Sequence, residues 1–274
     1  MENYNFNPAL AFARVAEDWI RYAEDTKCNK WIIGLSGGKD SNIVCALATE
    51  IFGKDNVLGV MMPNQSMKQE DIKNVEFLAK TYEVDCIKVN IGKAYDEILE
   101  QMDDSNISIS DDTRINLPPR LRMSTLYAVA QSWSGRPINT SNLSERMVGY
   151  STIWGDVCGA FAPIANLTTT EVIELGRWLG LPKELIEKPP ADGLSELTDE
   201  EKLGIKYAEL DKYIRTGEYE DEEKRRKYHK LYSSSRFKRD MINVPAATMP
   251  WYNKFTCKTP FEKSNEFIKN LKLN

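Results

Sequence analysis

The apolar segment Trp31–Leu35 is followed at once by the polar stretch Ser36-Gly-Gly-Lys-Asp-Ser41, and this junction constrains the fold more than any other feature. A short, continuous apolar run is typical of a parallel strand that is buried on both faces. Beyond the polar stretch, apolar residues recur at helical spacing from Ile43 to Ile51. A buried strand, a glycine-containing loop and a helix in direct succession indicate the first unit of an α/β fold.

The same alternation continues along the chain. Residues 57–62 and 85–89 have the composition of strands, residues 69–82 and 95–102 have that of helices, and residues 135–139 lead into one more short strand. Strands that alternate with helices predict a doubly wound parallel sheet with right-handed crossovers.

Polar segments follow three of the predicted strands, at residues 36–41, 62–64 and 139–141. Ligands of doubly wound sheets bind at the carboxyl ends of the strands, where such segments meet. We therefore expect these three loops to converge on one crevice that forms the functional site.

We expect one domain over residues 1–274, made of an N-terminal helix at 7–24, a sheet core at about 30–180 and a helical C-terminal region at about 181–274. Asn7 is a suitable cap for the first helix, and Pro8 suits its first position.

Three smaller features are also predicted from local sequence. Pro118-Pro119 is predicted to open a helix after the acidic loop 103–112. Residues 193–203 are predicted to form an exposed loop, and residues 221–239 one charged helix.

Composition excludes several classes of protein. The chain of 274 residues has a net charge of -5, a single histidine at His229 and five scattered cysteines. The acidic balance argues against a nucleic-acid partner, and one histidine is too few for a zinc site or a histidine-activated nucleophile. No stretch approaches the roughly 20 apolar residues of a membrane span, and a signal peptide is not evident. We therefore expect a cytoplasmic enzyme with reduced thiols and no membrane partner.

The stretch Ser36–Ser41 has the features of a phosphate-binding loop. Its two glycines let backbone N–H groups approach an anion, and the following helix start adds unpaired donors and a positive dipole end. It is not a Walker A loop, because Gly34 is too close to the Gly-Lys pair and Asp40 follows the lysine. The glycine-rich dinucleotide fingerprint also fails, because its third glycine is missing.

The stretch resembles the SGGxDS loop of the PP-loop enzymes, or ATP-pyrophosphatases, which have the adenine nucleotide alpha hydrolase-like fold. The resemblance implies that the loop binds the β,γ-phosphates of ATP, which leave as pyrophosphate. It also implies that a substrate carboxylate or carbonyl is adenylated, and that a nitrogen or sulfur nucleophile then displaces AMP.

Later segments resemble the ammonia-dependent NAD synthetases within this superfamily. The resemblance runs in register from about Trp31 to about Arg239 and rests on five blocks in the family's order. These blocks are Asn116–Met123 with Leu126–Ala130, Asn139–Glu145 with Val148–Tyr150 and Trp154–Asp156, Pro163–Ala165 with Leu179–Pro182, Glu187–Pro190, and Gly193–Leu194 with Leu197–Gly204.

The resemblance implies ATP-dependent amidation of deamido-NAD (nicotinic acid adenine dinucleotide) by ammonia, with ATP and Mg²⁺ required. It places Mg²⁺ on Asp40 and Glu145, and deamido-NAD on Arg120, Asp156 and Lys238. Lys39 and Asp40 are the expected catalytic groups. The implied ATP contacts are Gly34, Leu35, Ser36, Gly37, Gly38, Lys39, Asp40, Ser41 and Thr140.

The chain departs from the family pattern at five positions where the family commonly has a polar or charged side chain. These are Ile153, Ala160, Thr169, Ala191 and Phe237. The departures bear on the identity of the substrate more than on the ATP chemistry. If the family's side chains at the positions of Ile153 and Ala160 form a charge pair, this chain has lost both partners together, so neither charge is left unpaired.

Free ammonia is the expected nitrogen donor, because one helix before Trp31 leaves no room for a glutamine-hydrolysing module. The resemblance also implies a homodimer. Three alternatives stay open at this point: a PP-loop enzyme acting on another carboxylate, one acting on tRNA, and a non-catalytic adenine-nucleotide-binding protein. The basic run at 224–227 would serve a tRNA enzyme, although a solvated charged helix is the favoured interpretation of most of it.

Overall fold

The computed structural model describes residues 5–65, 67–187, 198–219 and 221–239, which all belong to one compact unit, Met1–Arg239. Residues 240–274 lie outside the described part, so the expectation of a single domain over the whole chain stays a prediction.

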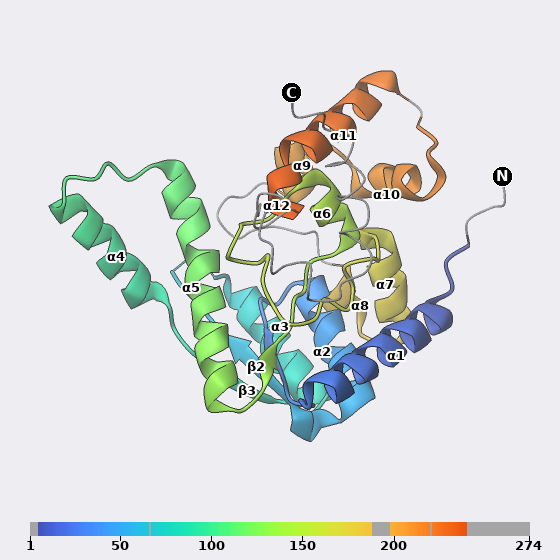
Figure 1. Cartoon of the computed structure of the whole chain (residues 1–274), viewed down its shortest axis with the longest axis horizontal. Helices are drawn as coiled ribbons and strands as arrows, with labels where there is room; N and C mark the ends of the chain where they lie inside the picture. The colour runs from blue at the N-terminus through green and yellow to red at the C-terminus, as the bar shows by residue number, and fades with distance from the viewer. Residues whose placement is uncertain (1–4, 66, 188–197, 220, 240–274) are drawn as a thin grey trace, which may run out of the picture. The chain divides into compact units, whose positions relative to one another are not determined.

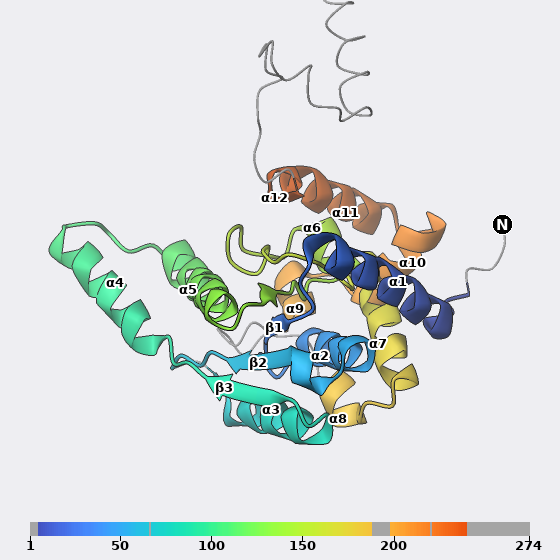
Figure 2. The ribbon, with the colours of Figure 1, turned by 60° about the horizontal axis from the view of Figure 1, so that its bottom comes forward.

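A parallel sheet forms the centre of the described part (Figure 2). Its strands are β1 (Trp31–Gly34), β2 (Val57–Met61), β3 (Asp85–Lys88) and β4 (Arg136–Pro137), in the order β3-β2-β1-β4. The register pairs Trp31 with Val57 on one side and with Arg136 on the other. Every predicted strand is confirmed, with ends that differ by a few residues.

Helices cover both faces of the sheet. Trp31 and Ile33 pack in the cluster formed by α1 (Pro8–Thr26), α2 (Lys39–Phe52), α3 (Gln69–Thr81), α7 (Thr169–Trp178) and α8 (Lys183–Ile186). Ile32 points the opposite way and packs with Leu126 and Ala130 of α5 (Asp111–Ser132). Because neighbouring strand residues face opposite sides, one apolar run serves both layers. The doubly wound α/β fold is confirmed.

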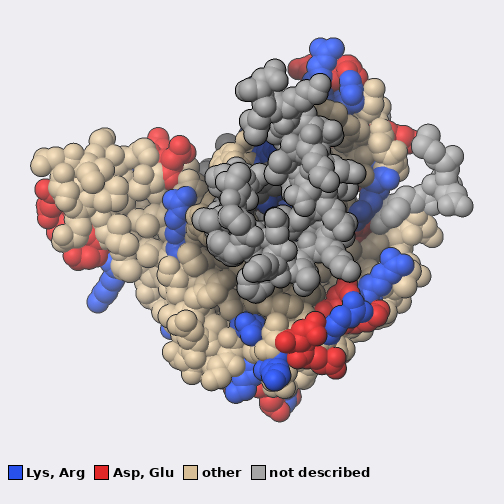
Figure 3. Space-filling model, viewed as in Figure 1, with Lys and Arg blue, Asp and Glu red and all other residues tan. Residues whose placement is uncertain are grey.

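The N-terminal helix is confirmed and is anchored by one tryptophan. Asn7 caps α1 by accepting from the Leu10 N–H at 3.0 Å. Trp19 is fully buried, with ring centroids 5.4 Å from Trp31 and 5.2 Å from Phe161. The exposed side of α1 mixes both charges (Figure 3), which is unlike the basic stripe of a nucleic-acid-binding surface.

The helix around Pro118 begins earlier than predicted. Its start is Asp111, where Ser110 accepts from the Thr113 N–H at 3.1 Å, and both prolines lie inside α5. Pro118 and Pro119 leave the carbonyls of the residues four positions earlier without a helical donor. Those residues, at 114 and 115, are exposed, so water can satisfy the carbonyls. Since α4 (Gly92–Asp104) also extends beyond its predicted end, the acidic loop shortens to residues 105–110.

After α7 the described chain is helical, as predicted, and contains no strand in residues 170–187, 198–219 and 221–239. The elements not yet given are η1 (Lys54–Asn56), α6 (Leu143–Val148), α9 (Asp199–Leu203), α10 (Tyr207–Thr216), α11 (Glu222–Ser234) and α12 (Arg236–Arg239). Within the described residues, every helix is too short or too polar to span a bilayer.

Two C-terminal predictions are wrong in part. The expected exposed loop at 193–203 contains α9, which a capping box between Thr198 and Glu201 starts, while residues 193–197 lie outside the described part. The expected single helix at 221–239 is divided at Ser235, whose hydroxyl donates to the Leu231 carbonyl at 2.7 Å.

Candidate active site

The loop from Ser36 to Ser41 joins β1 to α2, at the carboxyl end of the sheet. Its hydroxyls hold its shape: the Ser41 Oγ donates to the Gly38 carbonyl at 3.0 Å, and the Gly38 N–H donates to the Ser36 Oγ at 3.2 Å. Gly38 is the N-cap of α2 and has no side chain to occupy the free N–H groups of the first turn. These donors and the helix dipole favour an anion at this point.

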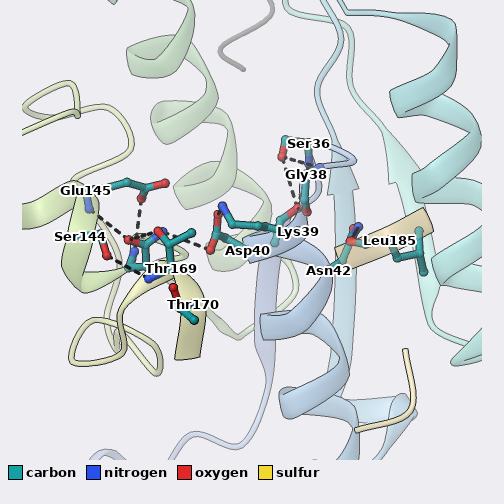
Figure 4. A network of polar contacts seen from close by, with 12 residues as sticks. Ser36, Gly38, Lys39, Asp40, Asn42, Ser144, Glu145, Thr169, Thr170 and Leu185 are labelled. Atoms are coloured by element: carbon teal, nitrogen blue, oxygen red, sulfur yellow. Dashed lines mark hydrogen bonds and ion pairs between the residues drawn. The ribbon is translucent and has the colours of Figure 1, made fainter. Parts of the chain in front are cut away.

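The buried Lys39 forms an ion pair with the half-buried Asp40 in the first turn of α2 (Figure 4). The Lys39 Nζ lies 2.7 Å from one Asp40 oxygen, and the Asn142 amide donates to the other at 3.2 Å. Burial acts to lower the pKa of Lys39, but the carboxylates of Asp40 and Glu145 outweigh it, so the pKa is raised. Lys39 therefore stays charged in its buried position.

Glu145 is placed by the start of α6. Asn142 and Glu145 form a capping box, in which the Glu145 N–H donates to Asn142 at 3.0 Å and the Asn142 N–H donates to Glu145 at 3.3 Å. Loss of water around the carboxyl group, and then repulsion from Asp40, raise the pKa of Glu145 to about 8. A cation between the two carboxylates would relieve this repulsion.

A second group of charges lies around Lys238. Its Nζ donates to the carbonyls of Gly149 at 2.7 Å and Ser151 at 2.6 Å, which ties α12 to the turn after α6. In the same region, the Asp156 carboxylate accepts from the Thr152 N–H at 2.7 Å. Burial lowers the pKa of Lys238, and the attraction of Asp156 opposes this shift.

Residues from all three of the predicted loops line a cavity of about 750 Å³, although Met62 is the only one from the loop at 62–64. Every residue predicted to bind ATP lines this cavity except Gly37, and so do Glu145, Asp156 and Lys238. Arg120 does not line it: this residue is exposed, and its Nε donates to the Ile153 carbonyl at 3.2 Å.

The cavity also has lining and supporting residues that were not assigned a role from the sequence, among them Arg122, Asn142, Asp199 and Lys202. The position of Arg122 could have been predicted from helical spacing. It precedes the buried residues Leu126 and Ala130 by four and eight positions, so the three residues share one face of the helix. The sequence near Asp199 and Lys202 of α9 contains no comparable pattern, because only the tertiary fold brings these two residues to the cavity.

None of the described departures from the family pattern lines the cavity. Ile153, Ala160, Thr169 and Phe237 do not line it, and Ala191 lies outside the described residues. Phe237 is 57% exposed, whereas Thr169 is buried and its hydroxyl donates to Asn142 at 3.4 Å.

Comparisons with known proteins agree with this geometry. The family model described as NAD synthase matches residues 12–242. The NH(3)-dependent NAD(+) synthetase of Pyrococcus furiosus is 35% identical over 75% of this chain and 78% of that protein. That of Methanocaldococcus jannaschii is 38% identical over 70% of this chain and 74% of that protein.

Two solved structures have the same fold. The NMN synthetase from Francisella tularensis is 26% identical, with a TM-score of 0.82 over 89% of this chain and 100% of that chain. The NH3-dependent NAD synthetase from Campylobacter jejuni is 24% identical, with a TM-score of 0.72 over 88% and 100%. From the family match and the level of identity to these relatives, the chain belongs to the NAD synthase family.

Proposed function

We propose that this protein amidates deamido-NAD with ammonia to give NAD, converting ATP into AMP and pyrophosphate. The observation that carries the proposal is the ion pair of the buried Lys39 with Asp40 at the start of α2. This pair lines one cavity together with Glu145 and the second charged group around Lys238. Family membership favours this reaction over a tRNA-modifying enzyme or a non-catalytic nucleotide-binding protein.

The reaction needs two bond exchanges at one carboxyl group. A carboxylate oxygen of the nicotinate attacks the α-phosphorus of ATP, and the bond from that phosphorus to pyrophosphate breaks. Ammonia then attacks the acyl carbon, the carbon–oxygen bond to AMP breaks, and the ammonium proton is lost to solvent. The free N–H groups of the first turn of α2 orient the phosphates, and Lys39 neutralises the charge that grows on pyrophosphate.

Mg²⁺ fits the residues present. Asp40 and Glu145 offer carboxylate oxygens, and Mg²⁺ commonly takes one or two such groups besides phosphates and water. Loss of water around Glu145, and then repulsion from Asp40, raise its pKa, and a cation would relieve the repulsion. When held by Asp40 and Glu145, the ion would neutralise negative charge on the phosphates of ATP. We also propose that the enzyme is a cytoplasmic homodimer, to be tested by light scattering.

The test is NAD formation by the purified protein supplied with ATP, Mg²⁺, ammonium and deamido-NAD, with pyrophosphate followed in parallel. We expect Asp40→Asn to lower kcat by about 100-fold or more, because it removes one of the two carboxylates that would hold Mg²⁺ and also the partner of Lys39. Asp55→Asn, at an exposed aspartate just beyond the other end of α2, is the matched control and is expected to keep full activity. Absence of NAD with the wild-type protein would refute the proposal.

Nicotinic acid mononucleotide is a second candidate substrate. The NMN synthetase from Francisella tularensis has a higher TM-score, 0.82, than the Campylobacter NAD synthetase, at 0.72. Measuring kcat/KM for both acids under one set of conditions decides between them. A preference of more than about tenfold, or about 1.4 kcal/mol, for the mononucleotide would replace the first proposal.

A further inference from the structure

Arg122 is a cation that the cavity itself contains. It lies on α5, lines the cavity, and its Nε donates to the Met62 carbonyl at 3.3 Å. Met62 follows β2, the strand beside β1 in the sheet, so Arg122 lies one strand away from the loop after β1. Arg120, two positions earlier, points out of the same helix instead.

The guanidinium of Arg122 has donors to spare. The bond to Met62 uses one N–H of five, and no carboxylate among the described residues forms an ion pair with it. Burial lowers the pKa of Arg122, and the attraction of Asp156 opposes this only in part. A partly desolvated cation that faces a cavity without a contacting counter-ion is suited to an anionic ligand.

Two clusters of charge can be distinguished in the cavity. Lys39 interacts with Asp40, Glu145 and Asp199, whereas the carboxylate that acts on Arg122 and on Lys238 is Asp156, which also repels Glu145. The first group contains the loop and helix start that suit the triphosphate of ATP. The second group is therefore available to the other substrate.

We infer that Arg122 binds an anionic oxygen group of the pyridine nucleotide substrate and so determines its affinity. This inference rests on the proposed function, because it takes the second substrate to be a pyridine nucleotide. The group is either a phosphate or the nicotinate carboxylate, since a guanidinium fork binds both in the same geometry.

The experiment is a calorimetric titration of the wild-type protein and Arg122→Gln with deamido-NAD, nicotinic acid mononucleotide, NAD and ATP. We expect Arg122→Gln to weaken binding of the acid nucleotides by about tenfold or more, and binding of ATP by less than about twofold. Retained ATP binding also shows that the variant is folded. Arg122→Lys keeps the charge and loses the fork, so an intermediate loss is expected.

NAD distinguishes the two sources of the anion, because it keeps the phosphates and carries an amide in place of the carboxylate. Equal weakening of NAD and deamido-NAD by Arg122→Gln assigns the phosphates, and weakening of deamido-NAD alone assigns the carboxylate. Arg14→Gln, at an exposed arginine of α1, is the matched control and should change neither.

The inference is overturned if Arg122→Gln binds the acid nucleotides as tightly as the wild type, if Arg120→Gln alone weakens them, or if the wild type binds neither acid. Failure of the proposed function looks different: the wild type binds the acid nucleotide and Arg122→Gln weakens that binding, yet no amide is formed with ATP and ammonium.

Discussion

The backbone conformation of Gly37 and the space around it explain why the loop after β1 needs glycine at this position. Its φ is +79°, and a Cβ at this position would lie 2.5 Å from the Asp71 carbonyl oxygen. Gly38 differs, since its φ lies outside the left-handed region and its nearest neighbour would be the Ser36 hydroxyl at 3.2 Å. The close approach of Asp71 of α3 to Gly37 therefore constrains the loop.

We predict that Gly37→Ala lowers the free energy of unfolding by more than Gly53→Ala and also weakens ATP binding. Gly53 has a φ of +80° with nothing within 4 Å, so its substitution carries the backbone strain alone, about 1–3 kcal/mol. At Gly37 the clash with Asp71 adds to that strain and displaces the loop. Urea unfolding and ATP titration of both variants provide the measurement. Equal destabilisation, with ATP binding retained, would show that the contact with Asp71 is unimportant.

At the scale of elements, Asp211 of α10 holds α6 and α7 together. Its carboxylate accepts from the Ser144 hydroxyl, and from both the N–H and the hydroxyl of Thr170 at 2.7 Å. Ser144 in turn accepts from the Thr169 N–H at 2.9 Å (Figure 4). Because Ser144 precedes Glu145, this buried network sets the position of the helix start that carries the proposed metal ligand.

We predict that Asp211→Ala lowers the free energy of unfolding by about 3 kcal/mol, since it leaves buried donors without a partner. It should also raise the Mg²⁺ concentration that gives half-maximal activity. Asp221→Ala is the control, because Asp221 is an exposed cap of α11, and its loss should cost about 1 kcal/mol and leave the Mg²⁺ requirement unchanged. An unchanged Mg²⁺ requirement in Asp211→Ala would remove the link from α10 to Glu145.

Elements defined by local sequence were predictable, and those defined by distant contacts were not. The strand, loop and helix from Trp31 onward follow from an apolar run, two glycines and helical spacing. The start of α5 was misplaced because a proline pair usually marks a helix start, whereas Ser110 supplies the actual cap. Asp199 reaches the cavity beside lining residues of which the nearest earlier one, Cys158, lies 41 positions before it, and no local pattern contains that information.

For the molecule as a whole, the Cys45 thiol and the Tyr82 hydroxyl limit the stability of the fold at high pH. Cys45 is fully buried, and burial raises the pKa of its thiol to about 12 from an ordinary 9.0. Burial also raises the pKa of Tyr82 to about 12. In both cases the folded protein retains a proton that the unfolded chain loses. The stabilisation is therefore complete below about pH 9 and is lost as the pH rises from 9 to 12.

We predict that the free energy of unfolding falls above pH 9, with Cys45 contributing up to about 1.4 kcal/mol per pH unit. Urea unfolding at pH 8, 9, 10 and 10.5 measures the slope. Cys45→Ala removes the thiol and a little core volume, so it should be less stable at pH 8 and yet lose stability less steeply above pH 9. Parallel slopes for the wild type and Cys45→Ala would show that ionisation of this thiol does not limit the fold, and would leave Tyr82 and the other buried hydroxyls to account for any loss.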